Sequence, residues 1–193
     1  MKQAALLAAF IAVVSTSFAS PGKNDCPIKN YNDTALIKAL NIQEMLQEII
    51  NATGLQQNFE LKQADVLNIE ASISHRKRYI LYNLAFITTI NDLTKNKWAV
   101  MALLAHEVGH HLNGHTIRKG GSIPELELQA DEFAGFILHK LGATLQQSQN
   151  VMYYIAKEKN SRTHPAKASR LLAIEKGWNN ASVLGINDTV SNK

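Results

Sequence analysis

Hydrophobic positions along the first half of the chain change their spacing, and each change predicts a different element. Residues 34–52 carry apolar side chains at helical spacing, which predicts an amphipathic helix ended by Gly54. Residues 59–67, 68–75 and 78–84 are strand-like, and the last of these is rich in β-branched and aromatic side chains. The polar residues between the last two segments predict a hairpin turn.

The second half of the chain predicts helices. Asn91 and Asp92 offer a cap for a helix over 93–112, which ends at Asn113 and Gly114. Three more helices are predicted over 124–141, 144–159 and 165–176. One helix, a small sheet and four later helices predict an α+β fold.

Length and composition agree with one domain. The chain has 193 residues, of which 46% are hydrophobic and 19% charged, enough for a single ordinary globular core. We expect the domain to cover residues 34–178. A flexible segment over 20–33 is expected before it, and a tail over 179–193 after it.

The first 19 residues have the pattern of a secretory signal peptide. Lys2 precedes an apolar run over 4–14, and the small residues Ser17 and Ala19 form a cleavage site. A membrane anchor is the alternative, but the run is shorter than the roughly 18 residues that span a bilayer. We therefore expect a chain exported to a bacterial periplasm or secreted. No transmembrane segment is expected in the mature chain, while peripheral contact with a membrane stays open.

Charge and cysteine content narrow the range of possible binding partners. Loss of Lys2 leaves 19 basic side chains against 16 acidic ones, a net charge of +3, and the basic residues are scattered. This balance does not indicate nucleic-acid binding. Cys26 is the single cysteine, so it has no partner for a disulfide within the chain. The oligomeric state is not indicated.

The stretch LLAHEVGHHLNGH, residues 103–115, concentrates titratable side chains in a segment that otherwise predicts a buried helix. At about 100° per residue, His106 and His110 lie about 40° apart on one face with Glu107 beside them. Two imidazoles therefore reach one metal ion while the carboxylate faces its open position. His111 and His115 lie roughly 140° and 180° from His106 and cannot join the same ion. A role in supporting the ligands stays open for whichever of the two faces inward.

The surroundings of this His-Glu-x-x-His motif favour a metal over chance. By our estimate about one shuffled sequence in a hundred contains the motif, so polar positions on an ordinary helix are the alternative. Residues 98–105 are apolar on every side, however, and unpaired charge in a buried helix is costly. A bound metal removes that cost.

A third ligand is expected downstream, because a catalytic zinc has three protein ligands and one open position. The predicted helix over 124–141 offers Glu127 and Asp131, four residues apart on one face. The small residues Ala130 and Ala134 share this face and allow close approach to the motif helix.

Taken together, these motifs resemble those of the gluzincin metallopeptidases of the HtpX and CAAX-prenyl-protease type. The resemblance rests on His-Glu-Val-Gly-His, on Glu127-x-x-x-Asp131, and on Thr163-His164-Pro165 followed by an arginine, and it spans about residues 75–175. It implies a zincin-like single domain, in which a small sheet packs with helices and a downstream helix supplies the glutamate ligand. Since the transmembrane helices of those enzymes are missing, the chain looks like a compact, soluble minigluzincin.

The resemblance implies roles for four residues of the motif helices. His106, His110 and Glu127 match the ligands of one zinc ion per chain. Glu107 matches the general base.

Further residues are assigned around the ligands. Asp131 matches an acid that hydrogen-bonds a ligand histidine. His164 matches a catalytic histidine over the cleft, and Pro165 in the first helical position would direct it off a helix end, with a solvent-facing cap as the alternative. Arg170 pairs with Asp131 or with the ligand glutamate, or is a surface arginine; these interpretations stay open. Asn113 is also placed near the ligands.

The predicted function is zinc-dependent endopeptidase activity on exported proteins or peptides. The strand over 78–84 is a hypothetical edge to which an extended peptide adds. The alternative is a zinc-stabilised peptide-binding or chaperone-like module without proteolysis. Glu107 counts against it, because structural zinc sites usually carry four protein ligands and have no use for a base. Hydrolysis of another amide, such as one in a cell wall, has little support, since the chain has no aromatic platform for sugars.

Overall fold

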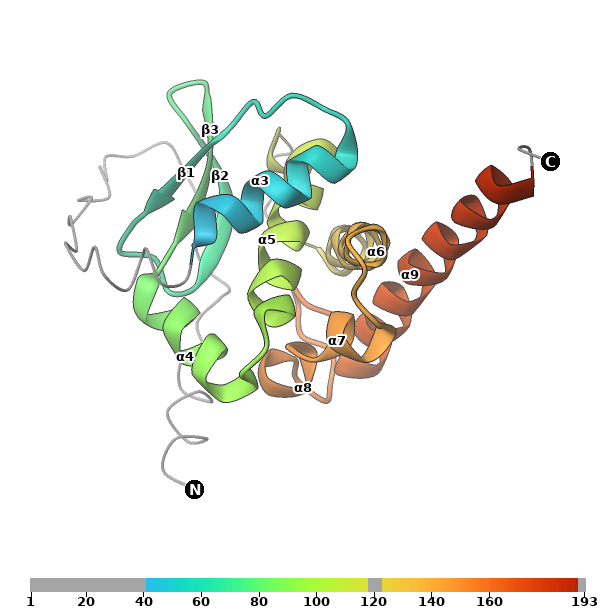
Figure 1. The fold of residues 1–193 in the computed structure, drawn as a ribbon. Helices are drawn as coiled ribbons and strands as arrows, with labels where there is room; N and C mark the ends of the chain where they lie inside the picture. Colours follow the sequence, from blue (N-terminus) through green and yellow to red (C-terminus); the bar gives the residue numbers. More distant parts are fainter. Residues whose placement is uncertain (1–40, 118–122, 191–193) are drawn as a thin grey trace.

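The computed structural model describes residues 41–117 and 123–190, with side chains as far as residue 183. The described part is an α+β fold in which α5 (Lys97–Leu112) runs through the centre. Figure 1 shows the sheet on one side of α5, α6 (Pro124–Lys140) and α9 (Lys167–Val190) on the other, and α3 (Ile42–Thr53) crossing α5. The predicted fold class, α+β with a small sheet, is confirmed.

Helix α5 is the core of the molecule. Asn96 caps it by accepting a hydrogen bond from the backbone N–H of Trp98. All residues over 99–111 are buried, and α5 contacts β2, α3, α4 and α6. The apolar run in the sequence therefore correctly predicted a helix covered on every side.

The sheet has three strands in the order β1-β3-β2. Strand β3 (Lys77–Tyr82) lies in the middle, parallel to β1 (Glu60–Gln63) and antiparallel to β2 (Ile69–Ser74). The predicted hairpin turn is confirmed, with His75 and Arg76 at φ of 48° and 64°. These values suit the two-residue turns that match strand twist.

The central position of β3 overturns the hypothesis that the strand over 78–84 is a free edge. Both sides of β3 are paired, to β1 and to β2. Among the described strands, β1 and β2 are the edges.

The helix predicted over 93–112 is two helices. Helix α4 (Leu84–Thr94) begins at Asn83, whose side chain accepts from the N–H of Phe86, and it contains the predicted cap residues 91 and 92. Lys95 then adopts a left-handed conformation with φ 48°, which ends α4 before Asn96 starts α5. The predicted starting point was wrong because an aliphatic run beginning at Leu84 is also helical.

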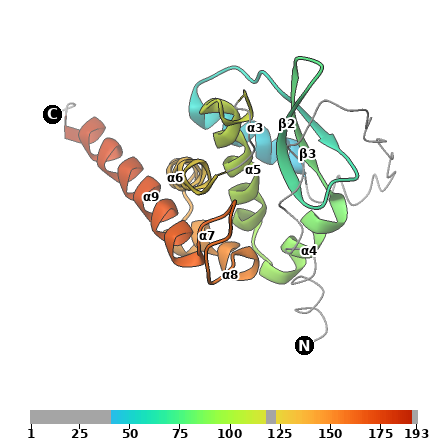
Figure 2. The same ribbon diagram turned by 180° about the vertical axis from the view of Figure 1, so that it is seen from behind.

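The C-terminal helices also differ from the prediction. The segment 144–159 forms two short helices, α7 (Leu145–Gln149) and α8 (Met152–Ile155). Helix α9 begins at Lys167, so Pro165 precedes the helix and does not occupy its first turn. Instead of ending near residue 176, α9 continues to Val190 and extends away from the body of the molecule, as Figure 2 shows from behind.

Glycines bring the helix backbones close together. A Cβ on Gly135 of α6 would lie 2.0 Å from the carbonyl oxygen of Ile174, and one on Gly177 of α9 would lie 1.8 Å from that of Glu132. A Cβ on Gly109 of α5 would lie 3.3 Å from the Cα of an α6 alanine. Helix α6 is thus held against both α5 and α9.

None of the helices within the described ranges has the length and apolar character needed to cross a membrane. The predicted signal peptide over 1–19, the segment over 20–33 and Cys26 lie outside those ranges.

Gly177→Ala is expected to lower the free energy of unfolding by about 1–3 kcal/mol, because the added methyl group has no room beside Glu132. Alanine favours a helix by about 1 kcal/mol over glycine, so the loss would oppose intrinsic propensity. Asn179→Ala, at an exposed site of α9, is the matched control. Urea denaturation of the purified proteins measures the effect, and equal stability of the two variants would contradict the close packing.

Candidate metal centre

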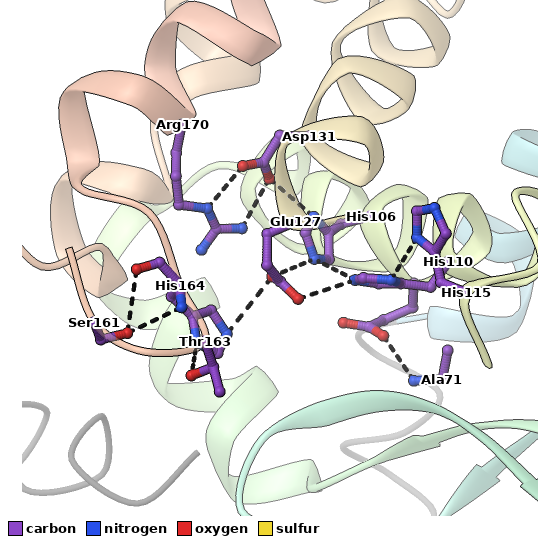
Figure 3. Close-up of polar contacts among 11 residues, drawn as sticks. Ala71, His106, His110, His115, Glu127, Asp131, Ser161, Thr163, His164 and Arg170 are labelled. Carbon is purple, nitrogen blue, oxygen red and sulfur yellow. Dashed lines mark hydrogen bonds and ion pairs between the residues drawn. The ribbon is translucent and has the colours of Figure 1, made fainter. Parts of the chain in front are cut away.

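Two helices bring three ligand groups together in the core. His106 and His110 come from α5, one turn apart, and Glu127 comes from the first turn of α6. The Nε2 atoms of the histidines lie 3.0 Å apart, and Glu127 carboxylate oxygens lie 3.3 Å from the first and 3.5 Å from the second. Figure 3 shows the three side chains converging.

These distances fit a metal ion. The candidate ligand atoms all lie within 4.8 Å of one another. Ligands about 2.0–2.2 Å from a tetrahedral ion are separated by about 3.3 Å, close to the separations found here. His106, His110 and Glu127 therefore could hold one metal ion, and they are the three residues that the sequence analysis assigned as ligands.

Charge in the cluster also fits a cation. Two carboxylates, Glu127 and Asp131, are buried within it, at 4% and 0% exposure. Burial favours their neutral forms, but His106 lowers the pKa of Glu127, and Arg170 and His106 lower that of Asp131. Burial lowers the pKa of His106, but the two nearby carboxylates outweigh this effect and raise the pKa to about 10. Both carboxylates thus favour their charged forms: Arg170 balances Asp131, while Glu127 offers negative charge to a cation beside the two histidines.

Glu107 lies beside the cluster and is held by the sheet. Its Oε2 accepts a hydrogen bond of 2.6 Å from the backbone N–H of Ala71 in β2. Burial raises the pKa of its carboxyl to about 7, against the opposing effect of His106. A carboxyl group with such a pKa can both take and return a proton near neutral pH.

Asp131 and Arg170 form a buried brace behind His106. Nδ1 of His106 lies 2.8 Å from Oδ1 of Asp131. Arg170 of α9 donates from Nε and one Nη to both oxygens of the same carboxylate, at 2.7 and 2.8 Å. The pairing of Arg170 with Asp131, one of the interpretations left open by the sequence, is the one found, and the surface alternative is wrong.

His110 has a different partner. Its Nδ1 lies 3.0 Å from Nδ1 of His115, whose Nε2 lies 2.9 Å from Oε1 of Gln129. His111, in contrast, points to the sheet, where its Nε2 contacts the carbonyl oxygen of Tyr79. Neither His111 nor His115 is among the candidate ligand atoms. For His111 this agrees with the helical geometry predicted, whereas His115 lies beyond the end of α5.

His164 approaches the cluster from the loop before α9. Its Nε2 lies 3.6 Å from a carboxylate oxygen of Glu127, and its Nδ1 lies 2.8 Å from the hydroxyl of Thr163. Ser161 accepts from the N–H of His164 and donates to its carbonyl oxygen (Figure 3). The loop, and not the first turn of a helix, therefore positions this side chain.

Asn113 does not take the place assigned to it beside the ligands. It is exposed and forms the C-cap of α5, where its N–H bonds the carbonyl oxygen of Gly109 and the N–H of Gly114 bonds that of His111. Its neighbour His115 contacts the ligand His110 instead.

Sequence reasoning missed the contacts of Ala71, Gln129 and Thr163, and left open whether His111 or His115 supports the ligands. Helical arithmetic could not place Ala71 or Thr163, because they lie on a strand and in a loop, and the histidine that Gln129 contacts lies beyond a helix end. The position of His115 five residues after His110 was the one available signal.

Comparison with known proteins adds a family match. Residues 36–122 match the family described as Peptidase family M48. This region includes α5 with His106, Glu107 and His110 and ends before Glu127. No curated protein and no solved structure was found to match the chain. The family match supports a metallopeptidase in general, and the geometry of the structure adds Glu127 as a third residue that could hold a metal ion.

Wild-type protein is expected to retain one divalent metal ion per chain, and His110→Ala to lose it, since two ligands remain of three. His139→Ala is the matched control, because that histidine packs on Trp178 away from the cluster. Elemental analysis after desalting gives the stoichiometry. Equal metal content in the two variants would exclude the assigned centre.

Asp131→Asn is expected to weaken metal binding about 10- to 100-fold by removing the charged support of His106. It should also destabilise the fold by about 3–5 kcal/mol, because buried Arg170 loses its partner. Glu132→Gln, at a surface pair with Lys176, is the control and should change neither property appreciably. Chelator competition and urea denaturation separate the two effects, and unchanged metal affinity in Asp131→Asn would refute the supporting role.

Proposed function

We propose that the chain is a zinc-dependent endopeptidase of the gluzincin type, similar to HtpX, that cleaves peptide bonds in exported proteins or peptides. The observation that carries the proposal is the placement of buried Glu107 beside a His106, His110 and Glu127 cluster. The match to Peptidase family M48 supports the same class of reaction.

Zinc is the metal we propose. Two imidazole nitrogens and one carboxylate form a ligand set found in catalytic zinc sites. Three protein ligands leave one position for water or substrate. The alternative of a purely structural ion is less consistent with this set, because such sites usually have four protein ligands.

The residues around the ion would divide the work of hydrolysis. Zinc, when bound, would act as a Lewis acid that activates water and polarises the scissile carbonyl. Glu107 would take the proton of the attacking water and return it to the departing amine. Its hydrogen bond from Ala71 holds the carboxylate in place for both transfers.

His164 is proposed to stabilise the negative charge that develops on the carbonyl oxygen. Its Nε2 faces the cluster at Glu127, while Thr163 holds its other ring nitrogen. This arrangement supports a role at the reacting centre over that of a solvent-facing cap.

A peptide substrate is proposed to lie along β2, the edge strand nearest to Glu107. Extended peptides bind exposed strand edges through main-chain hydrogen bonds. The N–H of Ala71 faces away from β3 toward Glu107, so this edge leads to the candidate centre.

Export remains part of the proposal and is supported by the sequence of residues 1–19. A peptide-binding module that holds zinc without cutting is the second candidate. The high pKa and burial of Glu107 favour hydrolysis, since a binding module gains nothing from burying this carboxyl.

Glu107→Gln is expected to lower the rate of peptide cleavage by at least about 10²-fold, because an amide cannot accept the water proton. Zinc content should stay at one ion per chain. Glu125→Gln, an exposed change in α6, is the control and should keep full activity. Incubation with a mixed peptide library, followed by mass spectrometry, measures cleavage and specificity together.

Zinc binding without cleavage by the wild-type protein would instead favour the peptide-binding module. Cleavage that persists in Glu107→Gln at matched zinc content would rule out Glu107 as the base.

A further inference from the structure

His115 lies against the side of His110 that faces away from the ligand cluster. Helix α5 ends at Leu112, and Gly114, with φ 70°, turns the chain so that the short helix η1 (His115–Ile117) follows. This turn brings Nδ1 of His115 to 3.0 Å from Nδ1 of His110. His115 is 8% exposed, and the two rings meet edge to face at 71°.

The positions of the protons in this pair follow from the metal site. Nε2 of His110 points to His106 and Glu127 and is the candidate ligand atom, so its lone pair is used by the ion. A neutral imidazole that binds a metal through Nε2 carries its proton on Nδ1. The Nδ1–H of His110 must therefore donate, and Nδ1 of His115 must accept.

The far side of His115 is consistent with this assignment. If Nδ1 of His115 accepts, its proton lies on Nε2, which is 2.9 Å from Oε1 of Gln129. An amide oxygen accepts hydrogen bonds and has no proton to donate. In both hydrogen bonds, from His110 to His115 and from His115 to Gln129, a donor thus faces an acceptor.

We propose that His115 is a positioning residue for the metal centre, fixed as the Nε2–H tautomer by Gln129 and orienting His110 by accepting its Nδ1–H. The proposal rests on the metal centre of the proposed function and goes beyond its ligands and base. His115 does not touch the ion, since its Nδ1 faces the rear of His110 and its Nε2 faces Gln129.

The two ligand histidines are consequently supported in different ways. His106 donates to a carboxylate that is itself paired with Arg170. His110 donates to a neutral ring, and no carboxylate is among the partners recorded for its Nδ1 within the described residues. A neutral acceptor fixes the direction of the ring without adding negative charge to a site that already contains Glu127 and Asp131.

The test separates hydrogen-bond acceptance from packing. His115→Leu removes the acceptor but keeps an apolar side chain of similar bulk, whereas His115→Asn places an amide oxygen near the position of Nδ1. We expect zinc affinity about 10- to 100-fold lower in His115→Leu and within a few-fold of wild type in His115→Asn. The visible spectrum of the cobalt-substituted protein should change in the first variant and be preserved in the second. Chelator competition and thermal melting of the metal-free proteins accompany both.

A direct measurement needs no substitution. Nitrogen-15 NMR of the imidazoles in the zinc-loaded wild-type protein distinguishes the tautomers, and His115 is expected as Nε2–H. An Nδ1–H tautomer overturns the proposal, even if His115→Leu does not fold. Equal zinc affinity in wild type and His115→Leu also overturns it, as does loss of affinity in His115→Asn equal to that in His115→Leu.

Failure of this inference is distinct from failure of the proposed function. If wild-type protein binds no zinc, or binds it equally well after His110→Ala, the metal centre itself is wrong. If zinc binds and His115 has the expected tautomer but no peptide is cut, the positioning role stands and the peptidase does not.

Discussion

The structure depends on keeping ionisable side chains inside a buried helix. Helix α5 is covered on every side over 99–111, yet it contains His106, Glu107 and His110. Buried polar groups without partners are costly, so each must be met by another element. Strand β2 contacts Glu107, α6 contacts His106, and η1 contacts His110. Arg170 of α9 in turn holds Asp131, the α6 partner of His106. The arrangement of the surrounding elements thus follows from the contacts that α5 requires.

Sequence patterns predicted the elements that depend on local spacing. The hairpin, the buried motif helix and the helix that supplies Glu127 follow from periodicity. The two histidine ligands follow from positions one turn apart, whereas the choice of Glu127 over Asp131 came from the resemblance to a family. The order of strands could not be predicted, because residues 78–84 have the same composition whether central or at an edge. The start of α5 was missed because it depends on a left-handed Lys95, a backbone conformation that a lysine does not indicate, and Asn91 and Asp92 offered a cap earlier in the chain.

Contacts between segments far apart in the chain could not be predicted from sequence spacing. Arg170 lies 39 residues after Asp131, so spacing left its partner open until packing of α9 on α6 brought the two together. His115 was misplaced for a different reason. If α5 continued to residue 115, His115 would lie about 180° from His106, but α5 ends before it. The turn at Gly114 reverses the expected direction and makes it a neighbour of His110.

The close approach of α6 and α9 has a consequence for recognising relatives of this chain. Carbonyl oxygens occupy the space that a side chain on Gly135 or Gly177 would need, so these positions admit little besides glycine. Gly135 follows Asp131 by four residues and Gly177 follows Arg170 by seven. A chain that shares the metal motif and both glycine spacings would be expected to build the same charged brace. A chain that has the motif without these glycines would need a different helix packing to bring an arginine to the aspartate.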